Sequence, residues 1–190
     1  MKAIAINGSP RKDGNTARLI QWVCDELHAN HIETDVLSLS GLKISGCKAC
    51  YQCFEKKNRR CSVKDDLNSI IEKLEVADAI ILGSPTYFTD VTAEMKALID
   101  RAGLVSRAND DMFRRKLGAA VVAVRRAGSI HVFDTINHFF LIGQMIIAGS
   151  SYWNMGIGLE KGDVESDEEG VQIMKQLGQN MAWLLKKISS

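Results

Sequence analysis

Four of the chain's five cysteines lie close together in the segment GCKACYQCFEKKNRRC, residues 46–61. Cys47, Cys50 and Cys53 are each separated by two residues, and Cys61 follows after seven more. Thiols this close together can form disulfides, bind zinc, ligate an iron–sulfur cluster or act as a redox dithiol. Zinc sites with four cysteines usually consist of two separated C-x2-C pairs, whereas evenly spaced cysteines in one short loop can reach different irons of a [4Fe–4S] cluster. The spacing favours a cluster, with zinc and free thiols as alternatives.

The composition argues against disulfides. The first residues, MKAIAINGSP, become polar too early for a signal peptide, and no long apolar run follows that could span a membrane. We therefore expect a cytoplasmic protein, in which thiols stay reduced. The formal net charge is +1, from 24 basic and 23 acidic residues, so we expect neither nucleic acid nor a membrane as a partner.

A second segment that could do chemistry, NGSPRKDGNTARL at 7–19, directly follows an apolar run. Its glycines allow backbone N–H groups to turn inward, Ser9 and Thr16 offer hydroxyls, and Arg11 offers a fork of donors. Asn15 is expected to cap and open a helix, whose positive end would face the loop. The spacing matches neither a P-loop nor G-x-G-x-x-G, which argues against a site for ATP or for a dinucleotide. The segment predicts a site for a phosphate monoester, and the alternative is an ordinary polar turn.

Two further loops follow apolar runs. The segment GSPTYFTD at 83–90 repeats the Gly-Ser-Pro pattern and adds Tyr87 and Phe88, which suit a flat heterocycle or could instead pack beneath a helix. In VRRAGS, Gly128 permits close backbone approach to a ligand, and Arg125 can equally be a solvated surface charge. These loops would complete a site for a phosphate with an attached ring system.

The elements that must position these loops alternate along the chain. Apolar runs predict strands at 2–6, 34–39, 78–83, 117–124 and 150–156, and amphipathic patterns predict helices at 15–30, 64–75, 90–102, 130–147 and 165–188. The segment 103–116 is the least periodic and is expected to be a long surface loop. Alternation predicts an α/β fold: a flavodoxin-like, doubly wound, five-stranded parallel sheet with helices on both faces, in one domain over 1–190. Because the cysteine run follows the second strand, we expect it at the same carboxyl edge as the other loops.

The segments GSPRKDGNT, GSPTYF and RRAG resemble the FMN-binding loops of the NADPH-dependent FMN reductase family. With the cysteine run, the chain more closely resembles the iron–sulfur flavoprotein branch of that family, whose motif is C-x2-C-x2-C and a fourth cysteine after a short gap. The resemblance implies three sets of residues: Ser9, Arg11, Asn15 and Thr16 for the FMN phosphate; Pro85, Thr86, Tyr87, Phe88 and Gly128 around the isoalloxazine; and Cys47, Cys50, Cys53 and Cys61 as ligands of a [4Fe–4S] cluster.

The resemblance implies an oxidoreductase that transfers electrons between FMN, the cluster and a partner such as ferredoxin or a small oxidant. It implies a ferredoxin-like or NAD(P)H donor, a small-molecule or protein acceptor, and a homodimer or homotetramer in which one subunit's cluster serves a flavin at the interface. No side chain need act as a catalytic acid, base or nucleophile. The alternatives are an NAD(P)H-dependent FMN or quinone reductase with a zinc-bound or empty cysteine loop, and a non-enzymatic electron carrier.

Five remaining residues with reactive side chains are expected to have no role in the chemistry. Cys24 lies in an amphipathic pattern and is expected to be a small core residue. His28, His31, His131 and His138 form no spacing typical of a metal site or a catalytic triad, so we expect structural or surface roles for them.

Overall fold

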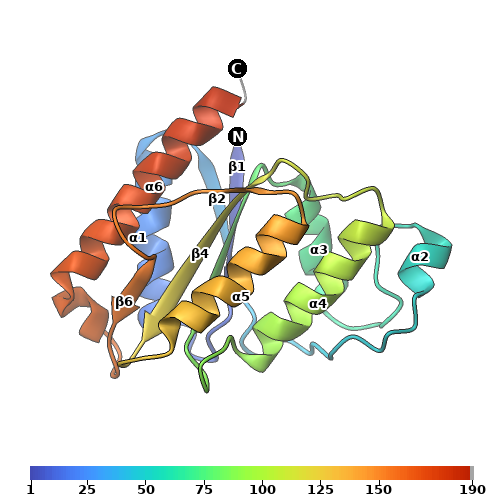
Figure 1. Cartoon of the computed structure of the whole chain (residues 1–190), viewed down its shortest axis with the longest axis horizontal. Helices are drawn as coiled ribbons and strands as arrows, with labels where there is room; N and C mark the ends of the chain where they lie inside the picture. The colour runs from blue at the N-terminus through green and yellow to red at the C-terminus, as the bar shows by residue number, and fades with distance from the viewer. Residues whose placement is uncertain (189–190) are drawn as a thin grey trace.

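A parallel sheet lies between two layers of helices in the computed structural model, which describes residues 1–188 (Figure 1). The strands are β1 (Lys2–Asn7), β2 (Glu33–Ser38), β3 (Ala79–Pro85), β4 (Leu117–Val124), β5 (Ile146–Ile147) and β6 (Met155–Ile157). The helices are α1 (Asn15–Ala29), α2 (Gln52–Lys56), α3 (Leu67–Val76), α4 (Ala93–Ala108), α5 (Ser129–Ile142) and α6 (Glu168–Ile188), with a short 3-10 helix η1 (Asp163–Ser166). None of these described helices combines the length and apolar content needed to cross a membrane.

The strand order is β2-β1-β3-β4-β5, and β6 pairs with β4 beyond the end of β5. All pairings in the sheet are parallel, so the carboxyl ends of the strands share one edge. This is the flavodoxin-like order, with neighbouring β1 and β3 at the switch point where ligands bind. The predicted fold class is confirmed.

Each inner strand contributes apolar side chains to both layers. In β1, Ala3 and Ala5 belong to the core beneath α1 and α6, whereas Ile4 and Ile6 belong to the core beneath α3, α4 and α5. All residues of β4 are buried. This two-sided burial explains why the strands are nearly continuous apolar runs in the sequence.

The predicted surface loop at 103–116 is wrong over its first part, because α4 continues to Ala108. Ala102, Val105 and Ala108 repeat every three residues and are buried against the core. Phe113, which follows the helix, is fully buried, and its ring lies 6.0 Å from that of Phe139. Most of the polar residues that made this segment look irregular follow the helix, at 109–116.

The predictions for 130–156 also need correction. The fourth predicted helix ends at Ile142 and not at 147, because the chain turns at Gly143. The fifth strand, predicted at 150–156, is replaced by the short strands β5 and β6, which pair with opposite ends of β4. Residues 148–154 form neither helix nor strand.

Candidate functional site

The loops after β1 and β3 are held together at the carboxyl edge of the sheet. The N–H of Gly8 donates to the carbonyl of Gly83 at 2.8 Å, and the Thr92 hydroxyl donates to the carbonyl of Gly8 at 2.8 Å. The N–H of Thr92 donates to the Ser84 hydroxyl at 3.1 Å. A Cβ atom at position 8 would lie 3.0 Å from the Gly83 carbonyl oxygen, so the close approach of the two loops requires glycine there.

A polar cleft opens at this edge, between the loops after β1, β3, β4 and β6. Seven of the nine predicted FMN residues line it: Ser9, Arg11, Asn15, Thr16, Pro85, Thr86 and Tyr87. Ala123, Arg125, Gly158 and Leu159 complete the lining. The lining of the cleft therefore combines hydroxyls, an amide and two arginines with a proline and an aromatic ring.

The start of α1 faces this cleft without a side-chain cap. The expected cap by Asn15 is wrong: Gly14 occupies the N-cap position, and no described side chain accepts a hydrogen bond from the first turn. The Thr16 side chain is buried at the cleft, and the Ser9 hydroxyl accepts a hydrogen bond from the N–H of Arg11 at 3.1 Å. An uncapped helix start leaves N–H groups and a positive dipole end for an anion such as phosphate.

One wall of the cleft was not predicted. The Asn15 amide donates to the carbonyl of Glu160 at 2.9 Å and accepts from the N–H of Gly162 at 2.9 Å, so this amide holds the loop after β6 against the phosphate loop. Lys161 and Asp13 form an ion pair across the same boundary. The N–H of Gly158 donates to the Val124 carbonyl at 2.9 Å, which fixes the loop to β4. In the sequence, only Gly158 and Gly162 could have indicated that this loop approaches a ligand site. Its partner Asn15 lies about 145 residues away, so no local pattern links the two.

Phe88 lies at the tip of a tight turn and does not line the cleft. Tyr87 and Asp90 exchange N–H to carbonyl hydrogen bonds at 2.9 and 3.0 Å, and Phe88 and Thr89 between them have φ values of 46° and 63°. Two left-handed residues in succession define a type I′ turn, which usually contains glycine or asparagine. The Phe88 side chain is fully exposed, so the turn presents an aromatic ring to solvent at a cost in backbone strain.

Gly128, the other predicted residue outside the lining, lies beneath this turn. It has a φ of +87°, and a Cβ atom there would lie 2.8 Å from the Thr89 side chain. Glycine is therefore needed both for the backbone conformation and for contact with the turn.

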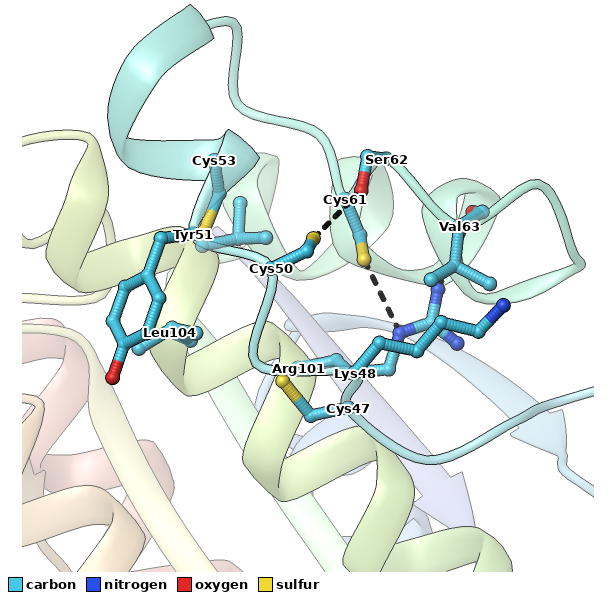
Figure 2. A pocket seen from close by; sticks show the side chains of 11 residues that line it. Cys47, Lys48, Cys50, Tyr51, Cys53, Cys61, Ser62, Val63, Arg101 and Leu104 are labelled. Carbon is cyan, nitrogen blue, oxygen red and sulfur yellow. Dashed lines mark hydrogen bonds between the residues drawn. The ribbon is translucent and has the colours of Figure 1, made fainter.

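The four clustered cysteines line one pocket with residues of α4 (Figure 2). The pocket is lined by Cys47, Lys48, Cys50, Tyr51, Cys53, Cys61, Ser62, Val63, Arg101, Leu104 and Val105. In Figure 2, the Cys50 sulfur points toward Ser62 and the Cys61 sulfur points toward Arg101. Within residues 1–188, no three side chains are arranged as the ligand set of one metal ion.

The environments of the four thiols differ. A hydrogen bond with the Ser62 hydroxyl at 3.2 Å lowers the pKa of the exposed Cys50 thiol. Burial raises the pKa of Cys53, whose side chain lies against the core. The Cys47 sulfur accepts the N–H of Ala49 at 3.4 Å. Polar hydrogens are thus directed at sulfur atoms in several parts of the segment.

The backbone of the cysteine segment is unusually rich in left-handed residues. Ala49 and Tyr51, on either side of Cys50, have φ values of 49° and 53°, and Lys57 and Arg59 have values of 44° and 61°. Each such residue costs about 1–2 kcal/mol relative to the right-handed region. The structure thus accepts this strain in the segment that carries the cysteines, as is common at functional sites.

The position of the cysteine segment after β2 predicted that it would lie at the carboxyl edge of the sheet. This prediction is wrong, because the segment leaves that edge. Residues 43–51 run without helix or strand to α2, which packs against α4 on the outside of the molecule (Figure 1). The pocket and the cleft share no lining residue. Leu104, in the pocket, lies eleven residues beyond the start of α4, roughly 16 Å along the helix.

The residues expected to have no role in the chemistry lie as predicted. Cys24 is fully buried in the core beside α6, and burial raises the pKa of its thiol to about 11, so it stays protonated and unreactive. All four histidines are exposed.

The strand order and the polar cleft at the carboxyl edge define a flavodoxin-like protein, a class whose ligands bind at that edge. Comparison with known proteins identifies the family. The chain belongs to the NADPH-dependent FMN reductase family, whose sequence model matches residues 1–160.

Individual relatives agree with this assignment. An iron–sulfur flavoprotein of Methanocaldococcus jannaschii is 36% identical over 195 residues, which cover 99% of this chain and 99% of the relative. An iron–sulfur flavoprotein of Methanosarcina thermophila is 32% identical over 190 residues, which cover 99% and 97%. The structure of an archaeal flavodoxin covers 98% of this chain and 99% of its own, with a TM-score of 0.63 at 19% identity, and so shares the fold. Family and fold together support an oxidoreductase role with FMN as the flavin.

Proposed function

We propose that this protein is an FMN-dependent redox flavoprotein that passes electrons between FMN, a [4Fe–4S] cluster and an external partner. The observation that carries the proposal is the convergence of four thiols on one pocket, in a chain that has a separate anion-binding cleft at its sheet edge. The likeness to iron–sulfur flavoproteins over nearly the whole chain supports it.

The residues of the cleft fit FMN. The uncapped start of α1, the buried hydroxyls of Ser9 and Thr16, and the Arg11 guanidinium would hold the phosphate. Pro85, Thr86 and Tyr87 offer a rigid and partly apolar surface to the flavin ring. Phe88 and Gly128 lie beside this surface, and we propose that the exposed Phe88 ring closes over the flavin or meets a partner there.

The residues of the pocket fit an iron–sulfur cluster by their donor chemistry. Cys47, Cys50, Cys53 and Cys61 supply four thiolates, and no imidazole or carboxylate lines the pocket with them. The N–H groups directed at sulfur suit ligands that share negative charge, and such hydrogen bonds tune cluster potentials. Binding would require the thiols to move from their present separate positions onto the irons.

When bound, FMN supplies one- and two-electron chemistry and the cluster supplies single electrons. The chain's own residues bind, orient and tune these groups. Because the pocket and the cleft lie on different parts of the chain, we propose a homodimer or homotetramer in which the pocket of one subunit serves the cleft of another.

The electron donor is proposed to be a ferredoxin-like protein or NAD(P)H, and the acceptor a protein or a small molecule. Exposed Lys48, Lys56 and Lys57 flank the cysteine pocket, which favours an acidic protein as the partner at that point.

The composition of anaerobically purified protein tests the proposal directly. We expect about four irons and four sulfides per chain, because a [4Fe–4S] cluster has that composition. We expect about one FMN per chain and a visible spectrum with both flavin and cluster absorption. Zinc, or a flavin spectrum without iron, would place the protein among reductases or carriers with a structural cysteine loop. Rapid NAD(P)H oxidation by iron-free protein would then identify the reductase.

Asn15→Ala tests the cleft wall formed by the loop after β6. Removing the amide breaks the hydrogen bonds to Glu160 and Gly162, so the loop after β6 loses its attachment to the phosphate loop. We expect FMN to bind about tenfold more weakly, which corresponds to about 1.4 kcal/mol. Flavin fluorescence titration of FMN-free protein measures this change. Asn180→Ala is the control, because its amide also donates to a backbone carbonyl but lies far from the cleft; equal effects of both changes would remove Asn15 from the site.

A further inference from the structure

Arg101 is buried directly beneath the cysteine pocket. It lies on α4, and its side chain is 0% exposed. It is the largest fully buried side chain in the described part of the chain. A buried guanidinium is costly unless its donors are satisfied, so its partners indicate what it does.

All five N–H groups of the Arg101 guanidinium can be assigned to acceptors within the cysteine segment or directly next to its two ends. Nε donates to the Cys61 sulfur at 3.3 Å. Nη1 donates to the carbonyl of Ser45 at 2.9 Å and to Asp65 Oδ2 at 2.6 Å. Nη2 donates to Asp65 Oδ1 at 2.9 Å and to the carbonyl of Val63 at 3.4 Å. One side chain thus contacts the segment before the first cysteine, after the last cysteine and at a cysteine sulfur.

These contacts close the base of the cysteine segment. Asp65 Oδ2 also accepts hydrogen bonds from the backbone N–H and the hydroxyl of Ser45, both at 3.0 Å. One residue further out, Asp66 accepts the N–H of Lys43 at 2.8 Å and donates its own N–H to the Lys43 carbonyl at 3.1 Å. The two ends of the segment therefore meet at the Arg101–Asp65 ion pair.

Closing the segment does not by itself require an arginine. Well-packed apolar residues usually replace a buried ion pair without loss of stability. What an apolar pair cannot supply is the charged N–H that Arg101 directs at the Cys61 sulfur, as Figure 2 shows. Hydrogen bonds from charged donors are the strong ones, and they favour the state of the acceptor that carries more negative charge.

We propose that Arg101 is the positioning residue of the cysteine site: it closes the segment 46–61 on α4 and gives the Cys61 sulfur a charged hydrogen-bond donor. This inference rests on the proposed function, in which Cys61 ligates the cluster. A donor to a ligand sulfur stabilises the more negative, reduced cluster, so Arg101 raises the reduction potential of the site.

Arg101→Lys is the first test. Lysine keeps the charge, but one ammonium group cannot replace the fork that joins Asp65 and Cys61. We expect unchanged FMN content, a more negative midpoint potential of the cluster in redox titration followed by EPR, and several-fold faster loss of iron to a chelator. Arg107→Lys is the control, because Arg107 lies on the same helix and its exposed side chain contacts Asp111.

Two further measurements test the role of Arg101 even if the Arg101→Lys variant does not fold. The double change Arg101→Met with Asp65→Leu removes the ion pair as a unit and leaves no unpaired buried charge, so we expect this variant to fold even if Arg101→Lys does not. It should lower the potential in the same direction. In iron-free protein, trypsin should cut the lysine- and arginine-rich segment 43–64 several-fold faster in both variants than in the control. A wild-type potential together with wild-type proteolysis in the double variant would overturn the inference. Absence of iron from the unaltered protein would instead overturn the proposed function, and the proteolysis would still test the closure.

Discussion

Replacing Cys53 by alanine is expected to remove essentially all cluster iron while leaving FMN bound. Cys53 is the last cysteine of the C-x2-C-x2-C run, and it is only 7% exposed, at the inner side of the pocket. A [4Fe–4S] cluster held by cysteine needs four thiolates, and loss of one leaves an iron open to water and oxygen. FMN should remain because the cleft shares no lining residue with the cysteine pocket.

Iron and sulfide analysis with an absorption spectrum, on protein purified without oxygen, measures this effect. Cys24→Ala is the matched control, because it also removes a buried thiol but lies in the core beside α6. The control should retain iron, sulfide and FMN. Full iron content in the Cys53 variant would show that Cys53 is not a ligand, and loss of FMN from the same variant would show that the two sites depend on each other.

The meeting of Ser9, Arg11 and Thr16 in one cleft could be predicted because its determinants are local. Ser9 and Arg11 lie in the loop after β1 and Thr16 lies in the first turn of α1, and a parallel sheet brings the end of β3 next to them. Their assembly needed only the strand order, which the apolar pattern predicts. The wall formed by Gly158 and Leu159 could not be predicted, since hydrogen bonds between distant parts of the chain place it.

The aromatic turn shows a different limit. Tyr87 and Phe88 are adjacent in the sequence and both suit a flat ring, but a type I′ turn sends their side chains apart. Tyr87 lines the cleft and Phe88 does not. Turn type depends on left-handed backbone angles, and neither Phe88 nor Thr89 is a residue that signals them.

The position of the cysteine segment could not be inferred from its place after β2. Residues 39–51 form neither helix nor strand, so their sequence has no periodic pattern from which their path across the molecule could be predicted. Tertiary contacts hold them instead, among them the hydrogen bond from Arg101 to the Ser45 carbonyl and those from Ser45 to Asp65. From the sequence, an arginine within a predicted helix is expected to be an exposed surface charge, and only the structure shows that Arg101 is buried.

Replacing Arg11 by alanine is expected to weaken FMN binding by about tenfold to a hundredfold, because a hydrogen bond to a charged group contributes about 1.5–3 kcal/mol. Arg11 lines the cleft beside the buried Ser9, and its guanidinium lies 3.5 Å from the carbonyl of Leu159 on the opposite wall. It is therefore placed to pair with a phosphate between the two walls. The effect should exceed that of Asn15→Ala, since a charge is removed as well as a hydrogen bond.

Titration of FMN-free protein with FMN, at low and high salt, measures both the affinity and its electrostatic part. Lys12→Ala is the control: it removes an adjacent exposed cation that does not line the cleft, so it should change the affinity little. Salt should weaken binding to the unaltered protein more than binding to the Arg11 variant, because the screened charge pair is already absent there. Iron content should stay unchanged in both variants. Equal affinities of the Arg11 and Lys12 variants would mean that the phosphate is held by the α1 start and the hydroxyls alone, and the site would then depend on helix polarity more than on a paired charge.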